Sequence, residues 1–177
     1  MKKEQYNLVL IGFMGTGKTS AGKIIARKMK REFVDIDEKI EAAAGHSISK
    51  IFERKGEKCF RVLESNIIRK ISKQNMLVIS TGGGAVLNPL NIKRLKKNGI
   101  IIAFLSKVMI IFNRISAQKD KRPLLSAANR TQGLKKLRVL LNKRLPLYTA
   151  SADYVFDTSN LTPAKTAKEV LSALKRK

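Results

Sequence analysis

The sequence "GFMGTGKTS" at residues 12–20 follows the apolar run "NLVLI" at residues 7–11 and precedes a segment of helical pattern. It has the form of a glycine, four residues, and then Gly17, Lys18 and Thr19, between a strand and a helix. Glycines let backbone N–H groups turn towards oxyanions, and the start of a helix adds a favourable dipole. Because a chance glycine-rich turn rarely has both flanking elements, the stretch predicts a nucleoside-triphosphate site.

In such a loop the lysine reaches the β- and γ-phosphates, and the hydroxyl after it ligates Mg²⁺. These positions are Lys18 and Thr19 here. The predicted nucleotide-binding residues of the loop are Gly15, Thr16, Gly17, Lys18, Thr19 and Ser20.

The composition indicates one soluble domain. The chain has 177 residues, of which 44% are hydrophobic, and this is enough for one core and short for two. The single cysteine, Cys59, excludes an internal disulfide and fits a reducing compartment. No apolar run reaches the length of a membrane span, and no signal-peptide pattern follows Met1. We expect a cytoplasmic protein with no membrane partner.

The charge is strongly basic, since 37 Lys and Arg residues face 13 Asp and Glu residues and give a net charge of +24. Clustered cations bind nucleic acid by releasing counterions from the phosphate backbone. Here the basic residues are spread along the chain in pairs, and only 6% of residues are aromatic. The pattern therefore favours a solvated lysine-rich surface, with no specific nucleic-acid partner.

Short apolar runs alternate with longer amphipathic ones, which predicts an α/β fold around a five-stranded parallel sheet. The expected strands are residues 7–11, 32–35, 76–80, 100–105 and 153–157. The expected helices are residues 18–30, 36–44, 47–73 with a break at Gly56, 89–97, 107–115, 131–148 and 163–175. Residues 116–128 have few large apolar side chains and are expected to form a mobile loop.

Three features beyond the glycine-rich loop suggest a second substrate. Asp35 and Asp37 lie at the end of the second strand, where strand alternation would put both carboxylates on one face at the ligand-binding edge. A plainer alternative is that Asp37 caps the next helix. Arg61 and Glu64 are three residues apart on one helical face, a spacing that is usually a surface ion pair. Three glycines at residues 82–84 follow the third strand and would let backbone amides approach an anion.

Taken together, these motifs resemble the shikimate kinase family of the nucleoside-monophosphate-kinase-like group. The matching stretches are "GFMGTGKT" at residues 12–19, "DID" at 35–37, "FRVLE" at 60–64, "GGGA" at 82–85, "RPLL" at 122–125 and "RLPLY" at 144–148. They occur in family order over nearly the whole chain. The resemblance implies one domain over residues 1–177, a P-loop three-layer α/β/α fold with a helical substrate-binding segment at about residues 35–64 and a mobile lid at about residues 116–128.

The resemblance also implies roles for individual residues. Asp37 would hold shikimate hydroxyls and act on the one phosphorylated, with Lys18 and Arg122 completing the catalytic set. Arg122, in the lid, would also bind the nucleotide phosphates. Asp35 would help Thr19 to hold Mg²⁺.

On the substrate side, the resemblance implies that Arg61 and Arg144 grip the shikimate carboxylate, because a guanidinium fork suits a planar anion. Gly83 and Gly84 would add backbone amides, and Glu64 would position Arg61. Phe52 and Phe60 would line the apolar side of the pocket.

The implied reaction is transfer of the γ-phosphoryl group of ATP, with Mg²⁺, to the 3-hydroxyl of shikimate. A monomer fits the size of the chain. A gluconate kinase or a nucleotide kinase of the same fold stays open as an alternative, as does a basic nucleic-acid-binding NTPase. Family members often carry an arginine after the last strand, near the adenine. Residues 159–162, "SNLT", have none, so adenine contacts would fall to Arg114 and Pro163.

Overall fold

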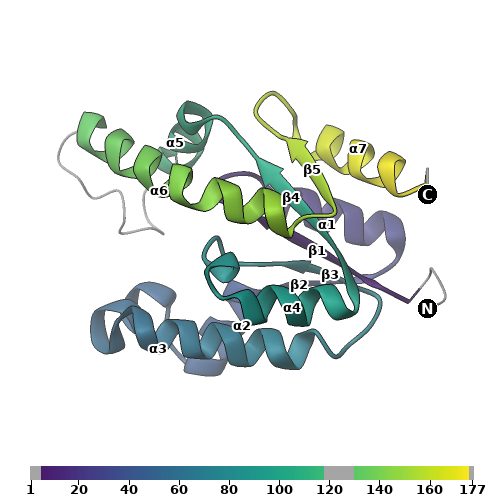
Figure 1. Ribbon diagram of the computed structural model, residues 1–177, viewed down its shortest axis with the longest axis horizontal. Coiled ribbons are helices and arrows are strands. Elements are labelled where there is room, and N and C mark those ends of the chain that lie inside the picture. Colours follow the sequence, from purple (N-terminus) through teal and green to yellow (C-terminus); the bar gives the residue numbers. More distant parts are fainter. Residues whose placement is uncertain (1–4, 118–129, 176–177) are drawn as a thin grey trace.

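The computed structural model describes residues 5–117 and 130–175 and contains one five-stranded parallel sheet (Figure 1). Its strands are β1 Asn7–Gly12, β2 Glu32–Asp35, β3 Leu77–Ser80, β4 Gly99–Leu105 and β5 Tyr154–Asp157. Their spatial order is β2-β3-β1-β4-β5, and every pairing is parallel. The sheet predicted from the sequence is confirmed, with strand ends shifted by at most one residue.

The helices also follow the predicted pattern. They are α1 Lys18–Met29, α2 Ile36–Ala44, α3 Ile48–Ile71, α4 Pro89–Lys97, α5 Val108–Ser116, α6 Arg130–Ser151 and α7 Pro163–Lys175, with a short 3-10 helix, Ala85–Leu87, before α4. Helix α1 ends one residue earlier than expected because Lys30 is left-handed, with φ of 53°. Met76 also has a positive φ, 63°, so β3 begins only at Leu77. The expected break in α3 is present at Gly56, with φ of 73° and ψ of 174°.

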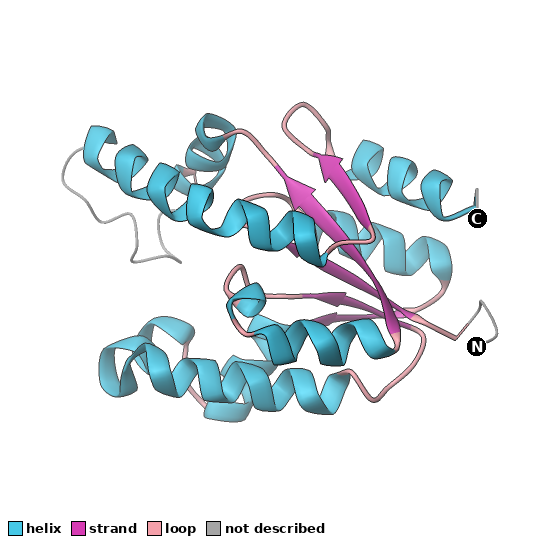
Figure 2. Cartoon of the chain, viewed as in Figure 1, coloured by secondary structure: helices cyan, strands magenta, loops and turns pink. Residues whose placement is uncertain are grey.

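Side chains of β1 alternate between two apolar clusters, one on each face of the sheet. Helices cover both faces and form the outer layers (Figure 2). Leu8 and Leu10 join residues of α1 and α7 on one face of the sheet. Val9 and Ile11 join residues of α2, α3, α4, α5 and α6 on the other face. The central strand is therefore buried on both sides, as expected for a parallel three-layer α/β/α protein.

The carboxyl ends of β1, β2 and β3 lie at one edge of the sheet, because the three strands are parallel neighbours. The loop 13–17, the start of α2 and the loop 81–84 all leave from this edge. In open α/β sheets ligands bind in this position. Residue 116, where the expected lid would begin, is the last residue of α5, and most of that segment, including Arg122, lies outside the described residues.

The central strand should dominate the stability of the fold. Replacing Leu10 by alanine removes a side chain that is 0% exposed between β1, α1 and α7. We expect Leu10→Ala to lower the free energy of unfolding by about 2–5 kcal/mol in urea denaturation. The control Val155→Ala, on β5 at 46% exposure, should change it by about 0.5 kcal/mol or less. Equal losses for the two variants would contradict a core centred on β1.

Candidate functional site

The loop between β1 and α1 is shaped by backbone conformations that favour glycine. Gly12 has φ of 140°, and a Cβ there would collide with the carbonyl oxygen of Phe104 on β4. Gly17, the residue before α1, is left-handed with φ of 91°. The chain can therefore turn directly from the buried strand into the helix, as a phosphate-binding loop requires.

Lys18 is held inside this loop. Its Nζ atom donates hydrogen bonds to the carbonyl oxygens of Gly12 and Phe13, at 2.8 and 2.9 Å, and the residue is only 8% exposed. The hydroxyl of Thr16 donates to the Phe13 carbonyl at 2.8 Å, so this side chain stabilises the loop itself. Ser20 is exposed on the first turn of α1. Of Thr16, Lys18 and Ser20, Lys18 is thus the residue that brings a positive charge into the loop.

Asp35 connects the loop to the following helix. Its Oδ2 atom accepts a hydrogen bond from Thr19 Oγ1 at 2.9 Å, and its Oδ1 atom accepts one from the backbone N–H of Asp37 at 3.0 Å. Asp35 is therefore the N-cap of α2, and the interpretation of Asp37 as the cap is wrong. Asp37 lies in the first turn of α2, so the expected strand alternation of the two carboxylates is also wrong, although both lie at the same edge.

The Thr19 and Asp35 oxygens fit a magnesium ion. Mg²⁺ prefers hard oxygen ligands and is usually held by one or two protein groups together with waters and substrate phosphates. A hydroxyl and a carboxylate 2.9 Å apart beside the phosphate-binding loop match that donor set. Within residues 5–117 and 130–175 no group of three His, Cys, Asp or Glu side chains could hold a metal ion alone.

Arg61 and Glu64 form a buried ion pair on α3. Arg61 Nη1 lies 2.8 Å from Glu64 Oε2, and Arg61 Nη2 lies 2.9 Å from Glu57 Oε1. The Glu64 side chain is only 1% exposed, and this burial raises the pKa of its carboxyl group, against the opposing effect of Arg61. The Glu64 end of the pair is therefore buried, unlike the surface ion pair that the spacing alone suggests.

The loop 82–84 brings α2 and α3 together. A Cβ at Gly82 would lie 2.6 Å from Asp37 Oδ1 and 3.0 Å from Glu64 Oε1, so this residue separates two carboxylates at close range. A Cβ at Gly84 would collide with the Arg61 guanidinium. Asp37, Arg61 and Glu64 can converge only because residues without side chains lie between them.

Helix α6 completes this cluster through the carbonyl of Gly83. Tyr148 donates its hydroxyl proton to that oxygen at 2.6 Å, and Arg144 Nη1 donates to it at 3.3 Å. The Arg144 guanidinium also lies 5.7 Å from the centre of the Phe13 ring in the phosphate-binding loop. The structure thus places Arg61 and Arg144 at the same three-residue loop. The donation of Gly83 and Gly84 amides to a ligand stays a prediction.

Two polar atoms of the cluster are buried and lack a hydrogen-bond partner within the described part of the chain. They are Arg144 Nε and Glu64 Oε1. Buried polar atoms are nearly always paired, so an exception needs an explanation such as a ligand or a bound water. The position of these atoms between α3, α6 and the loop 82–84 points to an occupant that hydrogen-bonds.

A second arginine, Arg114 on α5, joins the loops on the nucleotide side. Its guanidinium donates to the carbonyl oxygens of Gly15, at 3.3 Å, and Thr158, at 3.0 Å. The Thr158 hydroxyl in turn donates to the Thr16 carbonyl at 2.9 Å. Arg114 and the residues after β5 therefore contact the phosphate-binding loop directly, while adenine contacts by Arg114 and Pro163 stay a prediction.

Two residues of the site were not found from the sequence, and the two phenylalanines expected at the pocket differ in burial. Tyr148 and Gly82 had no assigned role, although Tyr148 is four residues after Arg144 on one helical face, which is a usable signal. Phe60 is 4% exposed and belongs to the core, while Phe52 is 37% exposed with its ring 4.8 Å from that of Phe60. A lining role for either ring stays a prediction.

The geometry defines a class of protein. A phosphate-binding loop at the carboxyl edge of a parallel sheet is typical of P-loop nucleoside-triphosphate enzymes. Beside it, across the Phe13 ring, two arginines and a carboxylate converge on the loop 82–84. This arrangement is that of a P-loop kinase whose second site suits a small anionic acceptor.

The chain belongs to the shikimate kinase family. The family model described as shikimate kinase matches residues 14–175. The shikimate kinase of Thermodesulfovibrio yellowstonii is 46% identical over 170 residues, covering 96% of this chain and 95% of that protein. The shikimate kinase of Thermoanaerobacter pseudethanolicus is 46% identical over 167 residues, covering 94% and 95%.

A solved structure agrees with this membership. Shikimate kinase from Acinetobacter baumannii in complex with shikimate superposes with a TM-score of 0.89 at 34% sequence identity. The match covers 98% of this chain and 95% of that one. The predicted family, fold class and kinase activity are therefore confirmed.

The burial of Tyr148 should make the free energy of unfolding depend on pH in the alkaline range. Burial raises the pKa of Tyr148 to about 12, outweighing the opposing effect of Arg144. An unfolded tyrosine ionises near pH 10, so above that pH the unfolded state loses this proton first. The free energy of unfolding should fall between about pH 10 and 12, by up to about 1.4 kcal/mol per pH unit.

The variant Tyr148→Phe removes this contribution together with the hydrogen bond to Gly83. We expect it to be about 1 kcal/mol less stable at pH 7 in urea denaturation and to show a shallower decline above pH 10. The control Tyr6→Phe leaves Tyr148 in place and should keep the wild-type decline. Identical pH profiles for wild type and Tyr148→Phe would show that the phenol is not buried as described.

Proposed function

We propose that this protein transfers the γ-phosphoryl group of ATP to the 3-hydroxyl of shikimate, giving shikimate 3-phosphate. The observation that carries the proposal is the convergence of Arg61 and Arg144 with Asp37 on the loop 82–84, beside the loop that holds Lys18. An acceptor with one carboxylate and several hydroxyls matches this set of side chains. The relatives that bear the name shikimate kinase, and the neighbour solved with shikimate, support the same acceptor.

On the donor side, the triphosphate would bind to the loop that follows Gly12. Lys18 would neutralise charge on the β- and γ-phosphates, and backbone amides of residues 15–19 would bind their oxygens. Magnesium, when bound through Thr19 and Asp35, would supply further charge neutralisation on the same phosphates. Arg122 would add a cation from the lid, and this role stays a prediction because the residue lies outside the described ones.

On the acceptor side, Asp37 would take the proton of the attacking hydroxyl. Its Oδ1 atom lies close to Gly82, at the edge where β2 and β3 end. Glu64 lies on the other side of Gly82 but is paired with Arg61, so it is a positioning residue. Glu64 would therefore orient Arg61, while Asp37, at the start of α2, would act on the acceptor hydroxyl.

The carboxylate of the acceptor would bind between Arg61 and Arg144. A guanidinium carries five N–H donors, and Arg61 uses three of its donor atoms on Glu57 and Glu64, which leaves N–H groups for a ligand. Arg144 keeps a buried Nε without a partner within the described part of the chain. Holding Arg61 with glutamates before binding lowers the entropy lost when the acceptor binds.

A comparative assay tests the proposal directly. ADP release is measured by a coupled reaction with shikimate, with gluconate, with nucleoside monophosphates and with RNA, each at several concentrations. We expect turnover only with shikimate and a phosphorylated product whose phosphate is on the 3-oxygen. Turnover with another acceptor would assign a different kinase of this fold, and hydrolysis stimulated by RNA, falling steeply with salt, would assign a nucleic-acid-dependent NTPase.

Oligomeric state and location are proposed from the sequence. A monomer fits a chain of 177 residues whose proposed site lies within one chain. A cytoplasmic location fits the single cysteine. Among the described helices, none combines the length and the apolar character needed to cross a bilayer.

The proposed base is tested by Asp37→Asn, which removes the proton acceptor and nearly preserves size. We expect kcat to fall by about two to four powers of ten, while the unfolding midpoint changes little. Glu38→Gln is the matched control, because Glu38 is the exposed neighbour on the same turn of α2, and it should retain activity. A variant Asp37→Asn with wild-type kcat would remove Asp37 from the mechanism.

The carboxylate contact is tested by Arg61→Lys. An ammonium cannot make the forked contact of a guanidinium, so the KM for shikimate should rise by about tenfold or more, with a smaller effect on the KM for ATP. The control is Arg54→Lys at an exposed position of the same helix. An unchanged KM for shikimate in Arg61→Lys would contradict the assignment of the carboxylate to this residue.

A further inference from the structure

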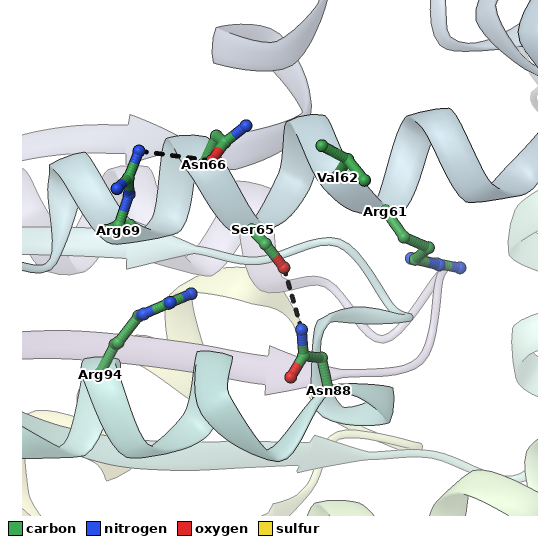
Figure 3. A pocket seen from close by; sticks show the side chains of 7 residues that line it. All are labelled: Arg61, Val62, Ser65, Asn66, Arg69, Asn88 and Arg94. Carbon is green, nitrogen blue, oxygen red and sulfur yellow. Dashed lines mark hydrogen bonds between the residues drawn. The ribbon is translucent and has the colours of Figure 1, made fainter.

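A cavity of about 360 Å³ lies between α3 and α4, apart from the phosphate-binding loop (Figure 3). Three arginines line it: Arg61 and Arg69 from α3 and Arg94 from α4. Figure 3 shows the Arg94 side chain extending from α4 towards α3, while the Arg61 guanidinium lies at the opposite end of the group. This size is within the range of about 300–1,000 Å³ typical of small-molecule sites.

The charge of this α3/α4 cavity is not balanced by its own lining, which contains no aspartate or glutamate. Arg61 is paired with Glu57 and Glu64. Neither Arg69 nor Arg94 has an ion-pair partner among residues 5–117 and 130–175, and Arg94 is half-buried. Two guanidinium groups on facing helices therefore have their charge available for an anion, and planar guanidinium groups bind phosphate well.

Neutral hydrogen-bonding groups line the space between these arginines. Asn88 Nδ2 donates to Ser65 Oγ at 3.0 Å across the two helices, as the dashed line in Figure 3 marks. Asn66 Oδ1 lies 3.5 Å from Arg69 Nη2. Because Ser65 accepts from Asn88, its own hydroxyl hydrogen can turn towards an anion. The polar groups of the lining are thus mostly hydrogen-bond donors, and Val62 and the arginine stems supply its apolar part.

A buried carboxamide, that of Asn91, lies on α4 between two of the lining residues in sequence. Asn91 is 0% exposed, and neither its side-chain oxygen nor its nitrogen has a hydrogen-bond partner within the described part of the chain. It lies three residues after Asn88 and three before Arg94, so helical periodicity puts it on the same side of α4 as these two lining residues, but its own side chain is packed beneath them and is not part of the lining. An unpaired buried amide is unfavourable unless an occupant or its bound water pairs with it.

We propose that the α3/α4 cavity binds a phosphate dianion, either free or as the ester of a small metabolite, through Arg69 and Arg94. The phosphate oxygens would accept from the two guanidinium groups and from Ser65. The volume accommodates an ester with a few carbon atoms beside the phosphate.

Binding there would also reach the acceptor site, and this consequence rests on the proposed function of Arg61. Arg61 lines the cavity and also contacts Gly84 beside the proposed acceptor carboxylate. An anion in the cavity would compete with Glu57 for the Arg61 guanidinium. Occupancy should therefore raise the KM for shikimate without lowering kcat.

The binding is tested by two-dimensional ¹H–¹⁵N NMR on the full chain, with a non-hydrolysable ATP analogue and Mg²⁺ present so that the positions of all three phosphates at the phosphate-binding loop are filled. The probes are inorganic phosphate and, separately, glycerol 3-phosphate, added at constant ionic strength. We expect saturable shifts of the side-chain amide signals of Asn66, Asn88 and Asn91. The probe with the lower Kd shows whether the free ion or a phosphate ester is the preferred ligand.

Charge-matched variants decide the outcome. The double variant Arg69→Gln/Arg94→Gln should weaken binding by about tenfold or more, since each lost charge-assisted contact is worth that much. Lys70→Gln/Lys97→Gln removes the same charge at exposed neighbouring positions and should bind as the wild type does. Absence of saturable shifts, or equal weakening in both variants, would overturn the proposal. Neither readout uses catalysis, so it stands apart from the assay with shikimate.

Discussion

The two oxygens of the Asp35 carboxylate join the two halves of this site. One accepts from Thr19 at the start of α1, and the other caps α2, the helix that carries Asp37. A single side chain at the end of β2 therefore fixes the position of the proposed metal ligand relative to the proposed base. Since both helices start at the same sheet edge, their separation is set by the spacing of strands β1, β3 and β2 and does not depend on a flexible loop.

Buried charge on the acceptor side is partly compensated by contacts within the chain. Glu64 is almost fully buried yet lies against Arg61, and Arg144 and Tyr148 share the Gly83 carbonyl. A buried ion pair contributes little net stability, because desolvation offsets the attraction. Its value here is positional: the guanidinium groups are oriented before any acceptor arrives. Such an arrangement favours binding of one acceptor geometry over general adhesion of anions to a basic surface.

The sequence predicted the sheet and helices well because the apolar periodicities were long and unambiguous, as in β1 and α3. It failed where one residue decided a local conformation. Lys30 and Met76 adopt positive φ values that the sequence pattern did not predict. Asp35 caps α2, a role that the sequence had offered only for Asp37, as an alternative. The nucleotide loop could be read from local spacing alone. The acceptor cluster could not, because Arg61, Gly82 and Tyr148 come from three distant segments and only the family resemblance brought Arg61 and Arg144 together.

The central place of β1 has a consequence for biosynthesis. This strand pairs with β3 on one side and β4 on the other, so its partners are residues 77–80 and 99–105. At about 5–20 residues per second, a ribosome needs roughly 5–20 s after β1 to make both. During that interval an apolar, β-prone strand has emerged without its sheet neighbours. The nascent chain therefore depends on early packing of α1 against β1, or on a chaperone, to keep this strand from aggregating.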